Sequence, residues 1–390
     1  MRNRPKFNLA DFFQQADLVL LGLCLASTVF GLVMISSATR YMGTQNSYRL
    51  LLVQAAAAVI GVVLYILLSM VDVEILVRKW RWILAFNVGF ICMLVPFGTV
   101  SHGNRAWIQF SWMPTSIQPA EIVKITFILL LARQFESVWE RRGEMKSFRS
   151  AVQPAMHMLF MVGLIYVISS DMGSALVYVF IFLCMALVAG MAWRWFALGL
   201  SLGGVGIFGL YKLGKIPGYM VDRFHAIFDH SFEPLDAGWQ QTRSLLAIGS
   251  GRLFGQGLYH GTQTQSANSS SLPYRHTDFI FAAVGEELGM IGCLVVIALL
   301  VAIIFRCLQV ARHARTPFSA YVCAGIAAML IFQTIENIGM CLFVMPVIGL
   351  TLPFFSYGGS SIVMLYAAMG IVSGIKLRAL PERVPGKFPR

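Results

Sequence analysis

Charged residues are scarce in this sequence. Asp, Glu, Lys and Arg make up 12% of its 390 residues, whereas 57% are apolar and the mean hydropathy is +0.72. A soluble two-domain protein of this length cannot bury so large an apolar fraction. Because one membrane span needs about 20 mostly apolar residues, the apolar content is sufficient for about ten helices. The composition therefore excludes a soluble cytosolic protein and predicts a polytopic membrane protein.

Several signatures of common sites are also missing. The seven cysteines include no Cys-x-x-Cys pair, and the seven histidines form no His-Glu-x-x-His or other metal-ligand spacing. The sequence thus predicts neither a disulfide framework nor a zinc site. The glycine-rich residues 249–261 match neither a P-loop nor a dinucleotide-binding turn, and no Gly-x-Ser-x-Gly motif occurs.

The apolar stretches predict an all-α protein with ten transmembrane helices. They run over residues 18–35, 50–70, 83–100, 118–134, 152–170, 174–190, 195–211, 279–305, 320–345 and 361–375. With both termini cytoplasmic, basic residues concentrate in the inside segments, and the short outside loops hold only Arg40, Arg49 and Arg105. Anionic lipids of the inner leaflet explain the net charge of +12, so no nucleic-acid partner is expected.

The outside segment 212–277, between spans seven and eight, is much longer than the other connections. Segments of this length are usually functional or disordered. This one has apolar residues at helical spacing, such as Tyr219, Phe224 and Ile227. We therefore expect an ordered re-entrant or interfacial structure there.

Several ionisable residues fall at membrane depth, where each needs a partner or a function. Glu121 and Lys124 are three residues apart on one expected helix, so they can neutralise each other or contact a substrate. Asp171 is expected to cap the span that follows it. Hydrogen bonds between helices are the expected role of three deeper carboxyl groups, those of Glu286, Glu287 and Glu336.

Asp278 differs because it lies at the water boundary, where the long outside segment meets span eight. A carboxyl group there can be wet enough to ionise and dry enough to have a raised pKa, as a general base requires. The alternative is an N-cap on span eight, which Thr277 or Asp278 would fill well. The residues alone leave both roles open.

Several blocks resemble the SEDS family of bacterial cell-wall polymerases over nearly the whole chain. They are residues 103–108 (GNRAWI), 118–121 (QPAE), 240–241 (QQ), 244–251 (SLLAIGSG), 255–257 (GQG), 272–282 (LPYRHTDFIFA), 285–289 (GEELG), 337–340 (NIGM) and 352–361 (LPFFSYGGSS). Within the family, the Glu336-Asn337 pair and the short tails resemble the RodA branch more than the FtsW branch.

The resemblance implies a single integral membrane domain, residues 1–390, in the bacterial cytoplasmic membrane. It implies an inverting peptidoglycan glycosyltransferase that polymerises lipid II at the outer face, for cell elongation and shape. Asp278 would be the catalytic base. The substrate-binding residues would be Arg105, Gln118, Glu121, Lys124, Gln241 and His276.

The implied partners are lipid II, a class B penicillin-binding protein and membrane lipids. Mg²⁺ or Mn²⁺ on the diphosphate is compatible with this chemistry, although no metal motif indicates a site. Two other functions stay open. They are a flippase for the lipid-linked precursor, which would use the intramembrane ion pairs as a pathway, and a non-catalytic scaffold for the penicillin-binding protein.

Overall fold

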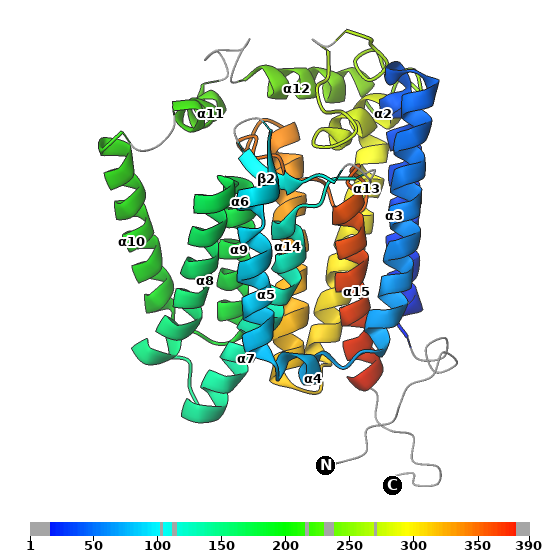
Figure 1. The fold of residues 1–390 in the computed structure, drawn as a ribbon. Helices are drawn as coiled ribbons and strands as arrows, with labels where there is room; N and C mark the ends of the chain where they lie inside the picture. The colour runs from blue at the N-terminus through cyan, green and yellow to red at the C-terminus, as the bar shows by residue number, and fades with distance from the viewer. Residues whose placement is uncertain are drawn as a thin grey trace, which may run out of the picture.

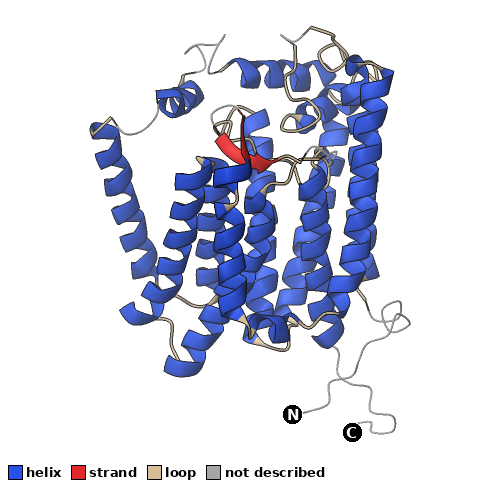
Figure 2. Ribbon diagram, in the orientation of Figure 1, coloured by secondary structure: helices blue, strands red, loops and turns tan. Residues whose placement is uncertain are grey.

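Long helices run side by side along one axis in the computed structural model (Figures 1 and 2). The structure describes residues 16–101, 104–110, 115–214, 218–229, 238–268 and 271–379. The long helices are α2 (Leu18–Thr39), α3 (Thr44–Met70), α5 (Trp80–Cys92), α7 (Pro119–Arg142), α8 (Phe148–Ser169), α9 (Met172–Val188), α10 (Trp193–Lys212), α13 (Ile280–Arg312), α14 (Pro317–Cys341) and α15 (Gly359–Ala379).

Shorter elements lie at the two ends of this bundle. At one end, called here the cap end, lie α11 (Gly218–Phe228), α12 (Trp239–Gly251) and the strands β1 (Gly98–Ser101) and β2 (Asn104–Ile108) (Figure 1). The 3₁₀ turn η1 (Arg40–Met42) follows α2, and α6 (Leu94–Phe97) follows α5. The short helix α4 (Val73–Val77) lies at the opposite end, called here the basic end.

The structure agrees with the expected class of fold and differs from it in detail. Eight of the described helical segments are long and apolar enough to cross a membrane. Two expected spans, 118–134 and 174–190, correspond to α7, which carries several charges, and to α9, a shorter apolar helix of 17 residues. Both pack on α14 within the bundle. The number ten stays a prediction.

The expected third span ends differently, because its last residues form an antiparallel hairpin. β1 pairs with β2 with Gly98 opposite Ile108 and Thr99 opposite Trp107. The fold is thus helical with one small two-stranded sheet at the cap end (Figure 2).

The centre of the bundle is α14, and its edge is α10. In α14, 78% of the most apolar stretch is buried, compared with 6% in α10. Close helix contact at the centre depends on small residues, as is usual in membrane bundles. A Cβ atom on Gly370 of α15 would lie 2.6 Å from the carbonyl oxygen of Tyr65 on α3.

Local sequence explains where several helices begin. The Asp17 carboxylate accepts the amide hydrogen of Leu20 in α2, and the Thr316 hydroxyl accepts that of Ser319 in α14. Such side chains satisfy amides that a helix start leaves without intrahelical partners. Pro119 at the first turn of α7 acts differently, because its fixed φ suits a helix start.

α13 is interrupted at Gly289, where φ is +67° and ψ is −164°. Residues 252–257 of the long segment fill the break. The amides of Gln256 and Gly257 donate to the carbonyl oxygens of Glu286 and Glu287, at 2.9 and 3.0 Å, and the Met290 amide donates to Arg252 at 2.9 Å. Irregular backbone at membrane depth is tolerated when protein groups satisfy it in this way. The first part of α13 is therefore a half-helix that begins next to Asp278.

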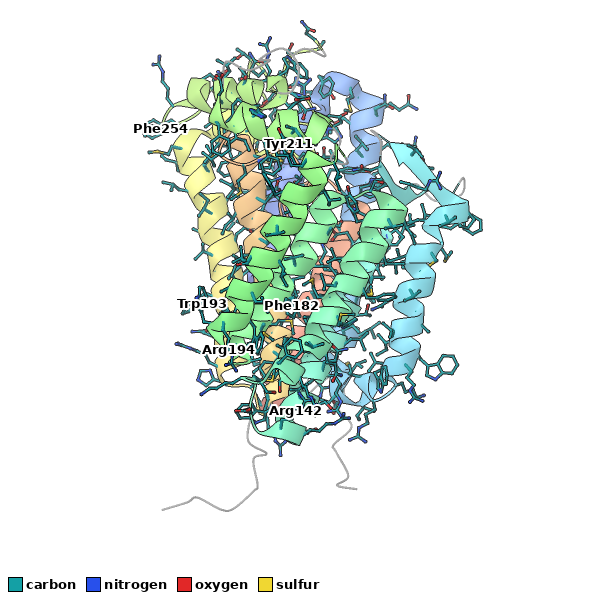
Figure 3. All side chains as sticks on the ribbon, turned by 90° about the vertical axis from the view of Figure 1, so that its left-hand side faces the viewer. Arg142, Phe182, Trp193, Arg194, Tyr211 and Phe254 are labelled. Carbon is teal, nitrogen blue, oxygen red and sulfur yellow. The ribbon has the colours of Figure 1, made fainter. Side chains whose placement is uncertain are left out.

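The expected basic segments gather at one end. The start of α2, the end of α15 and the turns α7–α8, α9–α10 and α13–α14 all lie at the basic end (Figure 1). Arg142 and Arg194 lie there, whereas Tyr211 and Phe254 lie toward the cap end (Figure 3).

Candidate active site

Asp278 lies at the cap end, directly before the half-helix of α13, and is partly buried. α13 begins at Ile280 and its N-cap position is Phe279, so neither Thr277 nor Asp278 occupies that position. Thr277 instead donates its hydroxyl hydrogen to the carbonyl oxygen of Tyr274, at 3.2 Å. Of the two roles that the sequence left open, this geometry does not support the N-cap.

Asn337 of α14 holds the backbone of Asp278. Its side-chain amide donates to the carbonyl oxygens of Asp278, at 2.8 Å, and Leu350, at 2.7 Å. One turn later, the Cys341 sulfur lies 3.9 Å from the same carbonyl oxygen of Asp278. One face of α14 therefore fixes the entry to α13 relative to the segment after α14.

Residues 342–350 are held further by the two cap helices. The Gln241 amide of α12 donates to the carbonyl oxygens of Met345, at 2.7 Å, and Met340, at 3.3 Å. The Arg223 guanidinium of α11 donates to the carbonyl oxygen of Val347, at 2.6 Å. Gln241 is thus buried and bound to backbone, and its expected substrate contact stays a prediction.

Residues 348–349 lie between Asp278 and the start of α9. A Cβ atom on Gly349, whose φ is +72°, would lie 3.8 Å from Oδ2 of Asp278. On the other side, a Cβ atom on Gly173 of α9 would lie 2.6 Å from the carbonyl oxygen of Ile348. Only glycine permits this approach at position 173, so the start of α9 packs close to the wall around Asp278.

Asp171 caps α9, as the sequence predicts. Its Oδ1 accepts the Ser174 amide hydrogen at 2.9 Å, and Oδ2 accepts the Ser174 hydroxyl at 2.7 Å. Gln118, one of the expected substrate-binding residues, donates its side-chain amide to the same Oδ2 at 2.9 Å. The starts of α7 and α9 are thereby joined through one carboxylate.

Glu121 and Lys124 form the expected ion pair in the first turns of α7. Lys124 Nζ lies 2.7 Å from Glu121 Oε1, and the lysine side chain is fully buried. Glu121 retains 8% exposure. The pair is thus a structural ion pair in this conformation, and a contact with substrate stays a prediction.

Arg105 on β2 is exposed. The aliphatic part of its side chain lies against Gly98 of β1, and Nη1 lies 3.5 Å from the carbonyl oxygen of Val95. The strand is continued by a bridge between Ile108 and Ile117, which leads directly into α7. Arg105 therefore presents a cation at the cap end, on the chain segment that precedes Gln118.

His276 lies two residues before Asp278 and packs on Tyr357, with ring centroids 5.9 Å apart. Burial, and secondarily the charge of Arg275, lowers the pKa of His276 to about 4, so the imidazole is neutral at neutral pH. The Tyr357 amide donates to the carbonyl oxygen of His276 at 2.8 Å, and the Ser356 hydroxyl donates to that of Thr277 at 2.6 Å. The segment before α15 thus fixes the approach to Asp278.

Glu286 and Glu287 are fully buried, and they bind the long segment more than other helices. Glu286 accepts hydrogen bonds from the amides of Gln263 and Thr264, both at 2.7 Å, and from two hydroxyl groups. Glu287 accepts the hydroxyl of Ser37 on α2, so only this bond joins two helices as expected. Charge-assisted bonds of this kind are strong. The segment is ordered here, as the sequence predicts.

The part of the chain that the structure describes contains no cluster of three or more metal-ligating side chains. No three side chains of His, Cys, Asp and Glu come together there with the spacing of metal ligands. Mg²⁺ or Mn²⁺ held on the diphosphate of a substrate stays a prediction.

Two residues that hold this site were not among the predicted site residues. Asn337 appears in the sequence only as part of the NIGM block, and its contact with Asp278 joins positions 59 residues apart. Arg223 sits in the long segment without any local motif. The helical spacing of the segment was the available signal for α11, but not for the contact that Arg223 makes.

The fold and this site define a class: a polytopic helical membrane protein with a half-buried acid at the rim of its bundle. The chain belongs to the FtsW/RodA/SpoVE family of cell cycle proteins, whose model matches residues 17–379.

Curated relatives cover most of the chain. A probable peptidoglycan glycosyltransferase FtsW of Geobacter metallireducens is 32% identical and covers 96% of this chain and 97% of its own. Stage V sporulation protein E of Bacillus subtilis is 33% identical, and the match covers 92% of this chain and 96% of that protein. Peptidoglycan glycosyltransferase MrdB of Escherichia coli is 34% identical, covering 73% and 75%.

Solved structures share the fold. A chain from a peptidoglycan synthase complex, solved to describe the coordination of polymerization and crosslinking, superposes with a TM-score of 0.76 at 26% identity, covering 93% of this chain and 98% of its own. The rod shape determining protein RodA of Thermus thermophilus gives 0.66 at 26% identity, covering 93% and 96%.

Proposed function

We propose that this protein is a peptidoglycan glycosyltransferase that polymerises lipid II, with Asp278 as its general base. The observation that carries the assignment is the position of Asp278, half-buried at the rim and held through its backbone by Asn337. The family membership and the names of the relatives support the activity.

The reaction needs one base. The hydroxyl group of the acceptor sugar attacks the anomeric carbon of the donor, its proton passes to Asp278, and the bond to the diphosphate breaks with the electron pair leaving on the diphosphate. This displacement inverts the anomeric carbon and needs no covalent intermediate. Asp278 suits the role because it is partly exposed at the cap end and does not cap α13.

The diphosphate requires cations, and two of the predicted substrate residues have them. Arg105 is exposed at the cap end, and its planar guanidinium suits phosphate oxygens. Lys124 is buried and would have to exchange Glu121 for phosphate. Gln118 and His276 would line the sugar path as neutral groups. Any Mg²⁺ or Mn²⁺ that takes part would be bound mainly by the diphosphate, as is usual for Mg²⁺ at phosphate substrates.

We further propose ten spans with the basic end in the cytoplasm and segment 212–277 outside. The collection of basic turns at one end supports this orientation. α7 and α9 would supply the two additional spans, since both lie between other spans and pack on α14.

We assign the protein to cell elongation, with a class B penicillin-binding protein as partner. The Glu336-Asn337 pair supports the elongation role, and the similarity to a chain of a peptidoglycan synthase complex supports the partner. Depletion in the native cell should give round cells. Filamentous cells would instead assign it to division.

Purified protein with labelled lipid II tests the activity. Glycan chains are expected from the wild type, and Asp278→Asn should lower the rate by about 10²- to 10⁴-fold. Glu144→Gln, an exposed change at the basic end, is the matched control and should retain full activity. Relocation of lipid II without glycan chains would identify a flippase. If the protein neither makes chains nor relocates lipid II, it is a scaffold. Near-normal synthesis by Asp278→Asn would overturn the base assignment.

A further inference from the structure

Buried polar atoms without partners gather on one face of α14. Among the described residues, half of the buried side-chain nitrogen and oxygen atoms that lack a hydrogen bond belong to four neighbouring residues: Gln333, Thr334, Glu336 and Asn337. Native structures satisfy nearly all such atoms, so a cluster of this kind needs an explanation.

Glu336 is the member of this cluster that most needs one. It is 3% exposed, and both of its carboxyl oxygens lack a hydrogen-bond partner. The group approaches the backbone of Ile348 without forming a hydrogen bond of normal geometry. An ionised carboxylate in such surroundings is costly, whereas a neutral carboxylic acid is tolerated and has a hydrogen to donate.

Asp278 is the nearby acceptor. Asn337, the next residue of α14, binds the Asp278 carbonyl oxygen at 2.8 Å, and Gly349, next to the Ile348 backbone that Glu336 approaches, would place a Cβ atom 3.8 Å from Oδ2 of Asp278. The two carboxyl groups therefore belong to one wall of the site. When two such groups interact, they hold one proton between them and only one ionises readily.

We propose that Glu336 is the positioning residue of the base: it carries the shared proton as a neutral acid and, when its unpartnered side chain turns toward Asp278, donates a hydrogen bond to that carboxylate, which is thereby the ionised partner. This inference rests on the proposed function, because it gives Asp278 its role. In the transfer step the proton of the acceptor hydroxyl goes to Asp278 and the electron pair leaves with the diphosphate, so Glu336 neither gains nor loses an atom.

Other ionisable groups near α14 are engaged elsewhere. On α14 itself, Tyr321, Cys323 and Cys341 also carry titratable groups, and the Cys341 sulfur lies 3.9 Å from the Asp278 carbonyl oxygen. The buried charged side chains on the helices packed against α14 have their own partners: on α7 Glu121 pairs with Lys124, and on α13 Glu286 and Glu287 bind the long segment. At the basic end, Lys376 of α15 pairs with Asp17. Asp171 caps α9, and Arg243 of α12 is partly exposed. A change of the polymerisation rate in alkaline solution is therefore assigned to the Glu336–Asp278 pair.

Three variants test the proposal in the lipid II assay. Glu336→Gln keeps a neutral hydrogen donor, so its kcat at pH 7 should stay within about three-fold of the wild type. The rate of the wild type is expected to decline in alkaline solution as Glu336 ionises, and Glu336→Gln should lack this decline. Glu336→Leu and Glu336→Met both remove the donor. Each should lower kcat at least ten-fold with little change in KM. Equal kcat in the Gln and Leu variants, or loss of activity in the Gln variant, would overturn the proposal.

Two measurements separate this test from the proposed function and from misfolding. Glu336→Leu should melt at the same temperature as the wild type or higher, because it replaces a buried polar group by an apolar side chain of similar size. The infrared spectrum of the wild type at neutral pH should contain a protonated-carboxyl band that Glu336→Gln lacks; its absence would overturn the neutral-acid assignment whatever the activity. A wild type that makes no glycan would refute the proposed function and leave the infrared result to decide the state of Glu336.

Discussion

The side-chain amide of Asn337 donates a 2.8 Å hydrogen bond to the backbone carbonyl oxygen of Asp278. With its second bond to Leu350, this amide joins the end of α14, the entry to α13 and the segment 342–350. Asn337 is fully buried, so both acceptors depend on it for their hydrogen bond. Asp278, the proposed base, is thus held by a residue 59 positions away in the sequence.

Asn337→Ala should leave these two carbonyl groups without their donor. Each unsatisfied buried group costs about 1–3 kcal/mol, so the melting temperature should fall clearly. The polymerisation rate should fall at least ten-fold, because a displaced base loses its alignment. Thr334→Val, on the same helix and at a hydroxyl without a partner, is the control and should change little. Wild-type activity in Asn337→Ala would show that Asp278 is positioned by other contacts.

The Glu121–Lys124 pair can be tested by a double-mutant cycle. Glu121→Gln and Lys124→Met should each destabilise the protein by about 3–5 kcal/mol, because each leaves a buried charge without its partner. The double variant should be more stable than either single variant, as measured by thermal melting in detergent. If it is stable but makes no glycan, the pair also contacts substrate. Additive losses of stability would show that the two residues do not interact.

The neutral imidazole of His276 predicts a sensitivity to acid. Burial lowers the pKa of His276 to about 4 in the folded protein, whereas an unfolded histidine has a pKa near 6.5. Between these values the unfolded chain binds more protons, so this contribution to stability is complete above about pH 6.5 and is lost as the pH falls toward 4. His276→Gln should therefore reduce the drop in melting temperature between pH 7.5 and pH 5. The exposed His260→Gln is the control, and an equal effect in both variants would refute the assignment.

Sequence reasoning predicted the features that arise from local chemistry. The apolar runs identified the helices, Asp171 was recognised as a cap, and the three-residue spacing of Glu121 and Lys124 indicated their ion pair. The resemblance led to Asp278 as the expected base, since its chemistry alone left an N-cap open, and that role stays a prediction. Contacts between distant segments were not predictable: the break of α13 at Gly289 depends on residues 252–257 that fill it.

The surroundings of Glu336 also could not be predicted from the sequence. A carboxyl group at membrane depth was expected to hydrogen-bond across helices, yet the described structure gives neither of its oxygens a partner. The sequence shows that such a group needs an explanation, but only the fold shows that the neighbouring charge is that of Asp278. Positions that break a local rule in this way often belong to functional sites.

The orientation of the chain decides whether Asp278 can meet a substrate at the outer face. Ala267 is exposed in the long segment at the cap end, and Glu144 is exposed in the turn between α7 and α8 at the basic end. In spheroplasts, an impermeant thiol reagent should label Ala267→Cys at once and Glu144→Cys only after the membrane is opened. The wild type measures the background from its seven cysteines, none of which is fully exposed. The reverse pattern would place the basic end outside, against the positive-inside rule, and Asp278 on the cytoplasmic side, where it could not act as the base of an outer-face polymerase.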